Sequence, residues 1–229
     1  MELPLVRAYP LYPGQWGIPG SDNSLGLRTV PQAKVFYVDP SDPLANDDND
    51  GTLPAAPLLT IQQAVDNCTS GNGDHIVVMP GTYDEDIVIT KDFITLLGAL
   101  PGGYARPDLV GDVGVALTVH GQGFYCKHIR IAAVAGQTAV IQQGNGFVYE
   151  DCVFDGDASL VMNLLPDLDD DSYTASEGLI TKCLFRGGTD GITFTNPGPG
   201  VEGGVGVTDV QIIDNVFYDQ SSNAIADKD

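Results

Sequence analysis

Apolar, polar, small and aromatic residues recur in a fixed order along the second half of the chain. The four copies are, in chain order, GFYCKHIRIAA (123–133), GFVYEDCVFDG (146–156), GLITKCLFRGG (178–188) and VQIIDNVFYDQ (210–220). Their alignment places one bulky apolar residue of each copy in register, namely Ile131, Phe154, Phe185 and Phe217, at intervals of 23, 31 and 32 residues. A second apolar run follows each copy, so each repeat holds at least two short strands. Such a repeat predicts a parallel β-helix.

The two longer intervals contain insertions, PDLDDDSYTASE and NPGPGVEGGVGVTD, which we expect to bulge from one fixed corner of the coil. Like strands of successive coils then pair about 4.8 Å apart. The three phenylalanines would form one interior column, and Cys152, Cys183 and Asn215 a second column that begins at His128. The alternative is a β-sandwich, in which neighbouring strands run in opposite directions and the aromatic register is a coincidence.

The pattern divides the chain into three parts. Residues 1–34 are rich in proline, glycine and tyrosine, which excludes a helix and predicts an extended arm. Residues 35–73 contain a short strand (35–38), an acidic loop and a helix over 61–68. Thr60 and Gln63 fit a capping box at the start of this helix, and its apolar positions recur at spacings of three and four. Residues 74–229 are the coils of the β-helix.

The arm carries Tyr9, Tyr12 and Trp16, which a disordered linker seldom contains. Large aromatic side chains on an extended segment indicate docking. The partner is the chain's own body, a neighbouring subunit or a larger assembly.

Composition narrows the classes of partner. The 229 residues include 31 acidic and 10 basic side chains, for a net charge of −21. So negative a surface repels nucleic acid and anionic membranes. No apolar run is long enough for a transmembrane helix, and the N-terminus lacks the pattern of a secretion signal. The four cysteines have no CxxC spacing, so neither a disulfide framework nor a zinc site is expected.

The first coil resembles a known superfamily. The segments VFYVDPSDPLANDDNDGT, APLLTIQQAVDNC and GDHIVVMPGTYDEDIVI are similar to the opening segment of pectin-lyase-like right-handed β-helix proteins. The resemblance covers residues 35–229 and implies that the helix over 61–68 plugs the first coil, where an open end would expose strand edges. The superfamily includes lyases, hydrolases, epimerases, adhesins and virus tailspikes, so it indicates fold far more than function.

Two acidic clusters could hold calcium. Asn46, Asp48 and Asp50 match the first half of a calcium loop, but Pro57 stands where its bidentate glutamate belongs. An Asx-rich turn is the competing interpretation. The second cluster is Asp169, Asp170 and Asp171 in the first insertion, where a solvated loop is the alternative.

Catalytic candidates are sparse. By resemblance to lyases of this fold, which use an Arg or Lys base, Arg130 and Arg186 become candidates, although neither has the flanking pattern of that family. GTDGITF (188–194) is similar to a motif of polygalacturonase-type hydrolases and would make Asp190 the acid, but its partner carboxylate is not evident. His75, His120 and His128 have no metal or triad spacing, and we expect His128 to be buried.

Two classes of function follow. The first is a structural virion protein, such as a bacteriophage tail or capsid spike, anchored through residues 1–34, trimeric by resemblance to tailspikes and able to bind a host-surface glycan. The second is an extracellular or virion polysaccharide lyase or glycoside hydrolase. A glycan-binding adhesin without turnover is intermediate, and Tyr173 in the first insertion is the only residue that points to it.

No C-terminal cap follows the last repeat, so we expect the natural polypeptide to continue.

Overall fold

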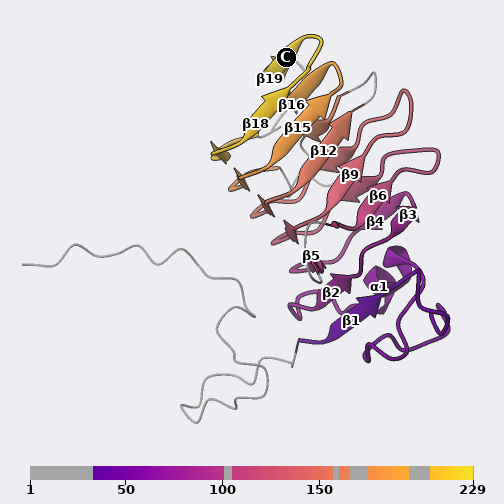
Figure 1. Cartoon of the computed structure of the whole chain (residues 1–229). Helices are drawn as coiled ribbons and strands as arrows, with labels where there is room; N and C mark the ends of the chain where they lie inside the picture. Colours follow the sequence, from indigo (N-terminus) through magenta and orange to yellow (C-terminus); the bar gives the residue numbers. More distant parts are fainter. Residues whose placement is uncertain (1–32, 101–104, 157–159, 166–174, 196–206, 229) are drawn as a thin grey trace, which may run out of the picture.

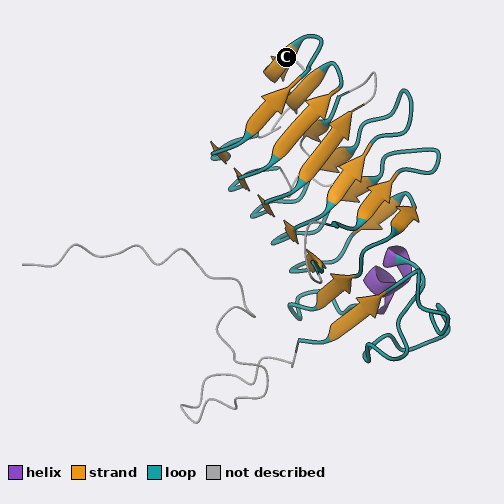
Figure 2. Ribbon diagram, viewed as in Figure 1, coloured by secondary structure: helices purple, strands orange, loops and turns teal. Residues whose placement is uncertain are grey.

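The structure is a computed structural model and describes residues 33–100, 105–156, 160–165, 175–195 and 207–228. Nearly all regular structure in these residues is β-strand, arranged in three sheets (Figure 2). Sheet 1 contains β1 (Val35–Val38), β2 (His75–Val78), β5 (Thr95–Gly98), β8 (Tyr125–Lys127), β11 (Val148–Glu150), β14 (Leu179–Thr181) and β17 (Gln211–Ile213). Sheet 2 contains β3 (Thr82–Asp84), β6 (Asp108–Val110), β9 (Arg130–Ala132), β12 (Val153–Gly156), β15 (Leu184–Gly187) and β18 (Val216–Tyr218). Sheet 3 contains β4 (Ile87–Ile89), β7 (Leu117–Val119), β10 (Val140–Gln142), β13 (Met162–Leu164), β16 (Asp190–Thr195) and β19 (Asn223–Lys228).

The chain visits the three sheets in rotation. Each coil from β2 onward contributes one strand to sheet 1, one to sheet 2 and one to sheet 3, and each strand pairs in parallel with its counterpart in the next coil. Figure 1 shows the coils stacked from indigo β1 to yellow β19. The fold is therefore a right-handed parallel β-helix, as the repeat predicts, and the β-sandwich alternative is wrong.

The predicted aromatic column forms inside the coils. Phe154 pairs in register with Phe185, and Phe185 pairs with Phe217. The Phe154 and Phe185 rings are stacked with centroids 4.7 Å apart, and the Phe185 and Phe217 rings with centroids 4.9 Å apart. Ile131 precedes them in the same column, paired with Phe154. The recurring phrase thus encodes one interior position in four coils.

The second column differs from the prediction by one residue. Cys152 and Cys183 are buried, and Asn215 follows them, with its Oδ1 accepting a hydrogen bond from the Cys183 N–H at 2.7 Å. The residue that begins this column is the buried Ile129, because it lies two positions before Ile131 as Cys152 lies two before Phe154. His128 instead occupies the corner between sheets 1 and 2 and is only half-buried.

That corner has a repeated backbone conformation. His128, Asp151, Lys182 and Asp214 all have φ between 50° and 61°. This left-handed conformation is uncommon for residues other than glycine. It turns the chain sharply from a sheet 1 strand into a sheet 2 strand with only two residues between them. The side chains at this corner therefore project outward, which explains why His128 is not an interior residue.

Helix α1 (Ile61–Asn67) covers the first coil, where it packs against β1, β2 and β4. Thr60 caps it by accepting a hydrogen bond from the Gln63 N–H, which is one half of the predicted capping box. The other half is replaced, because the Thr60 N–H donates to Asp47 and the Gln63 side chain donates to Asn67. Two distant carboxylates also bind its N-terminus. Asp47 accepts from the N–H groups of Leu59 and Thr60, and Glu85 accepts from those of Ile61 and Gln62. Lys91 donates to three carbonyls at the other end, those of Val65, Asp66 and Cys68.

The motif residues of the first coil are mainly structural anchors. Asp74 is fully buried and accepts hydrogen bonds from the N–H groups of Lys34 and Thr69. The Tyr83 hydroxyl donates to the carbonyls of Val38 and Met79. Gly51 has a φ of +68°, and a Cβ there would lie 2.6 Å from the Leu58 side chain. These contacts explain the NDGT, GD and PGTY elements by packing and hydrogen bonding alone.

Both predicted insertions fall at the same corner, between a sheet 3 strand and the next sheet 1 strand. The first follows β13 and the second follows β16. Within the described residues, no helix is long and apolar enough to cross a membrane.

Candidate functional site

The charged side chains of sheet 2 form a ladder that crosses four coils. Arg130 binds Asp108 of the coil below and Asp155 of the coil above. Arg186, one coil further, binds both carboxylate oxygens of the same Asp155. We call Asp108, Arg130, Asp155 and Arg186 the sheet 2 ladder. The alternation of acid and base joins each coil to the next on the outer surface.

Asp155 is the centre of the sheet 2 ladder, and its side chain is only 15% exposed. Burial alone would raise the pKa of its carboxyl group. Hydrogen bonds from Arg186 and Arg130 outweigh that effect and hold the pKa below its usual value. In return, the hydrogen bond to Asp155 raises the pKa of Arg186. A catalytic base has to release its proton near the working pH, so the raised pKa of Arg186 opposes that role.

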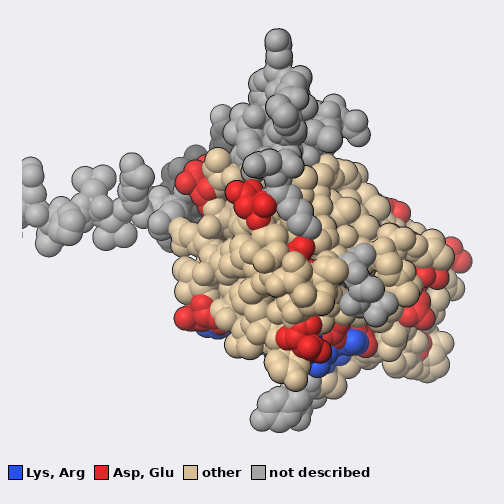
Figure 3. Space-filling model, turned by 90° about the horizontal axis from the view of Figure 1, so that it is seen from above, with Lys and Arg blue, Asp and Glu red and all other residues tan. Residues whose placement is uncertain are grey.

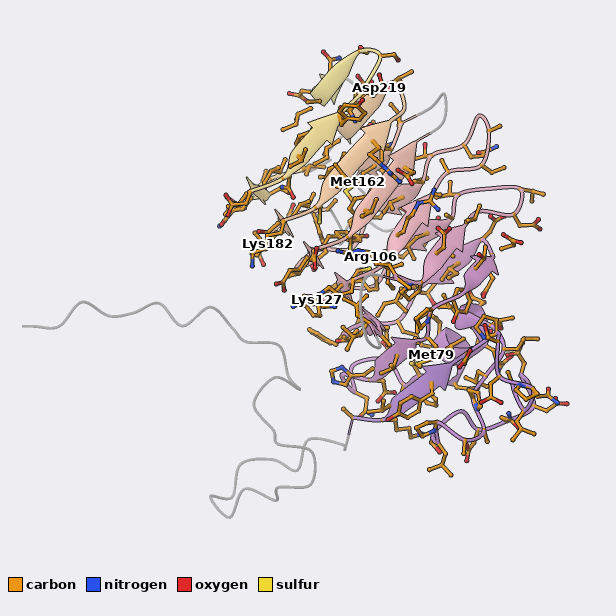
Figure 4. The ribbon with its side chains drawn as sticks, in the orientation of Figure 1. Met79, Arg106, Lys127, Met162, Lys182 and Asp219 are labelled. Carbon is orange, nitrogen blue, oxygen red and sulfur yellow. The ribbon has the colours of Figure 1, made fainter. Side chains whose placement is uncertain are left out.

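A second group of charges surrounds the neighbouring corner and sheet 1. Glu150 accepts a hydrogen bond from the Tyr125 hydroxyl at 2.7 Å and lies 3.2 Å from Lys127 Nζ and 3.7 Å from Lys182 Nζ. The Tyr125 hydrogen bond is the largest influence on Glu150 and lowers its pKa, with both lysines acting in the same direction against burial. Figure 4 shows Lys127 and Lys182 projecting from the same side of the stack. These residues also link three successive coils.

The corner residues themselves are paired. Arg106 donates to the carboxylate of Asp151 at 2.7 Å and also to its backbone carbonyl. His128 Nε2 lies 3.2 Å from the other oxygen of the Asp151 carboxylate. Burial lowers the pKa of His128 despite the opposing charge of Asp151. In Figure 3, basic atoms lie beside acidic ones on the visible face. At this corner, Arg106 and His128 are both engaged by the Asp151 carboxylate of the same chain.

Asp190 begins β16 and is 3% exposed. Its Oδ1 accepts hydrogen bonds from the backbone N–H and the side-chain amide of Asn223, both at 3.0 Å. Asn223 belongs to the next coil and pairs with Asp190 in register. The hydrolase-like motif therefore places its aspartate in sheet 3, where it pairs with the next coil, whereas Arg186 belongs to sheet 2.

The NDDNDG loop consists of Asx turns. Asn46 Oδ1 accepts from the Asp48 N–H, and Asp50 Oδ1 accepts from the Thr52 N–H and hydroxyl. Among the described residues, no group of three or more His, Cys, Asp and Glu side chains is placed to hold a metal ion. Asp47, which sequence reasoning overlooked, is the residue that ties this loop to α1. Calcium binding by Asn46, Asp48 and Asp50 stays a prediction.

Several predicted functional residues lie outside the described residues. They are Tyr9, Tyr12 and Trp16 of the arm, and Asp169, Asp170, Asp171 and Tyr173 of the first insertion. The sheet 2 ladder could have been found in part from the sequence. Asp155 and Arg186 each follow a phenylalanine of the repeat, so the register alone makes them neighbours.

Comparisons with known proteins give two solved structures. No family model matches the chain, and no curated protein does. A mutant pectin methylesterase in complex with a hexasaccharide matches with a TM-score of 0.47 and 12% identity, over 78% of this chain and 65% of that one. A rhamnogalacturonan lyase matches with a TM-score of 0.43 and 13% identity, over 81% and 62%. The chain thus spans about two thirds of their length or less. At this level of similarity the two structures indicate nothing about activity. The strand order and parallel pairing identify the chain as a parallel β-helix, and parallel crossovers of this kind are right-handed.

Proposed function

We propose that this chain is a structural component of a larger assembly, namely a virion appendage such as a bacteriophage tail or capsid spike, attached through residues 1–34. The observation that carries the proposal is the sheet 2 ladder. The arginines that could act as catalytic bases are held by Asp108 and Asp155, and they join coil to coil. Side chains used in this way contribute to the cohesion of the stack.

The fold supports a mechanical role. A stack of parallel coils in which each coil contacts its neighbours makes an elongated scaffold, and its stability grows with the interfaces between coils. Interior ring stacking and exterior ion pairing both act along the stacking direction. The net charge of −21 keeps such a scaffold soluble and apart from nucleic acid.

The proposed partners follow from this role. Other virion proteins would bind the arm through Tyr9, Tyr12 and Trp16, and copies of the chain would associate as a trimer. A host-surface glycan is the external ligand that such an appendage would meet. Cleavage of an acidic glycan by a lyase or hydrolase is the competing function. It requires a catalytic base or acid that is not engaged in an ion pair.

An incorporation experiment tests the proposal. Cells that produce the virus particles would express one of three chains. These are the wild type, a variant with Tyr9, Tyr12 and Trp16 all changed to alanine, and a Tyr218→Ala control. Tyr218 is an aromatic residue 67% exposed at the other end of the stack. Sedimented particles should contain the wild type and the control, and should lose the arm variant. Particles without the wild-type chain, or with the arm variant at wild-type level, would overturn the proposal.

A further inference from the structure

The outer face of sheet 1 holds more apolar than charged side chains. Alternate residues of each strand point outward, and every one of them from β1 to β14 is half-buried. From β1 to β17 they are Val35 and Tyr37, His75 and Val77, Thr95 and Leu97, Tyr125 and Lys127, Val148 and Glu150, Leu179 and Thr181, and Gln211 and Ile213. We call these fourteen positions the sheet 1 face. Eight of the fourteen are aliphatic residues or tyrosines, and Lys127 and Glu150 are its charged residues apart from His75.

The sheet 1 face also lacks the negative charge of the remaining surface. Its one carboxylate is Glu150, which lies beside Lys127 and Lys182. The chain as a whole has 31 acidic against 10 basic residues. An apolar surface from which acidic residues are depleted is typical of a covered surface rather than of a solvated one.

The composition of the N-terminal arm complements the sheet 1 face. Residues 1–32 contain two acidic and two basic side chains, so the arm is neutral and is not repelled. Pro10 and Pro13 favour the polyproline II conformation, in which residues three apart share one side and rise about 3.1 Å each. Tyr9 and Tyr12 would then be about 9.3 Å apart along the arm. Strands two coils apart are separated by a similar distance, roughly 9.6 Å. Two tyrosine rings can thus meet equivalent positions two coils apart.

The arm begins beside this surface. Lys34 directly precedes β1, the first strand of sheet 1. Its N–H donates to the Asp74 carboxylate, and its carbonyl accepts from the His75 N–H. The glycine-containing segment 17–33 would span about 23 Å as a flexible linker. Seven strands at about 4.8 Å spacing give the sheet 1 face a length of about 29 Å. A linker of this reach is comparable with the length of the face, so the arm can contact most of it, and its effective concentration there is high.

We propose that the sheet 1 face of the isolated chain is the docking surface for the chain's own residues 1–32, with Tyr9, Tyr12 and Trp16 as the contacting side chains. Docking covers apolar residues such as Val77, Leu97 and Val148. Because the two partners are already linked, it avoids the translational and rotational cost of bringing separate molecules together. If the proposed function holds, the arm is held on its own body until the assembly binds it. The docking itself does not depend on that function.

Trp16 is the only tryptophan of the chain, so its fluorescence reports the arm directly. Acrylamide quenching and the emission maximum would be measured on the full chain and on a peptide of residues 1–32. Two variants charge the sheet 1 face, Leu97→Lys and Thr95→Lys, and the second adds a charge without removing an apolar side chain. Ile141→Lys is the matched control, because Ile141 is a half-buried, outward residue of sheet 3. Circular dichroism confirms that each variant is folded.

In the full chain, the Trp16 emission maximum should be blue-shifted, and acrylamide quenching should be several-fold weaker than in the peptide. The protein should be a monomer, and its emission maximum and quenching should not change with concentration. Ile141→Lys should keep the protection of Trp16, and Leu97→Lys and Thr95→Lys should lose it. Peptide-like quenching of the wild type overturns the proposal, as does protection that survives in folded Leu97→Lys and Thr95→Lys. Protection that appears only with oligomers at high concentration also overturns it and assigns the surface to a second copy. Failure of particle incorporation would contradict the proposed function and leave the Trp16 result unchanged.

Discussion

Phe154 and Phe185 stack face to face inside two successive coils, with ring centroids 4.7 Å apart and ring planes inclined by 21°. Their backbones are also paired in register, so one spacing satisfies both strand pairing and ring stacking. The next pair, Phe185 and Phe217, repeats this geometry with a 13° inclination. Phe185 therefore has a ring on either side and is fully buried.

Replacing Phe185 should be among the most damaging changes in the core. Phe185→Ala removes the middle ring of the column and leaves a cavity between two others, so the free energy of unfolding should fall by about 3–5 kcal/mol. Urea unfolding followed by circular dichroism measures this loss. Tyr218→Ala, at a 67% exposed aromatic residue, should change the value by less than about 0.5 kcal/mol. Equal losses in the two variants would contradict the interior column.

The sheet 2 ladder predicts a salt-dependent loss. Asp155→Asn removes the carboxylate that binds both Arg130 and Arg186, and we expect the free energy of unfolding to fall by about 1–2 kcal/mol, because the arginines are partly exposed. Raising the ionic strength should narrow the difference from wild type. The control is Asp84→Asn, since Asp84 is an exposed carboxylate in the same outward column. A loss as large in Asp84→Asn would contradict the ladder.

Acidification should destabilise the chain through its histidines before it affects the ladder. Burial lowers the pKa of His75, so the folded state favours the neutral imidazole. The resulting contribution to the free energy of unfolding is fully present above about pH 6.5, the pKa in the unfolded chain. It is lost as the pH falls through the lower pKa of the folded state. His128 acts in the same direction. The lowered pKa of Asp155 stabilises the fold above about pH 4 and is lost only below that. The free energy of unfolding should thus fall as the pH drops below about 6.5, with a smaller slope in His75→Asn. An unchanged slope would show that His75 does not titrate differently on folding.

Asp47 should matter more than its acidic neighbours. Asp47→Ala removes the acceptor for two backbone N–H groups and the Thr60 hydroxyl, so we expect a loss of about 1–2 kcal/mol in the free energy of unfolding. Asp48→Ala changes the exposed residue next to it and should have little effect. Thermal unfolding compares the two directly. The reverse order would indicate that the loop is organised around Asp48, as a calcium site would require.

Periodicity predicted the coils well because each coil fills the same interior. Phe154, Phe185 and Phe217 are similar residues in one environment, so their register is visible in the sequence. The repeat does not indicate β6, because Asp108–Val110 is a three-residue strand that precedes the first recurring copy and follows a proline-containing connection. Without β6 the pairing of Asp108 with Arg130 could not be predicted, although that of Asp155 with Arg186 could.

The corners were the least predictable part of the chain. His128, Asp151 and Lys182 adopt a left-handed backbone conformation that their residue types do not reveal. The interior assignment of His128 was therefore wrong by one position, and Ile129 takes its place. The anchoring contacts of Asp47 and Glu85 on α1 join segments distant in sequence, and no local pattern indicates them.

The proposed structural role makes Arg186 and Asp190 stabilising residues rather than catalytic ones. The most direct test measures unfolding and acidic-polysaccharide cleavage on the same preparations of wild type, Arg186→Gln and Asp190→Ala. We predict that both variants unfold more easily and that the wild type yields neither unsaturated uronate products nor new reducing ends. Cleavage by the wild type that disappears in a variant of unchanged stability would contradict the structural role.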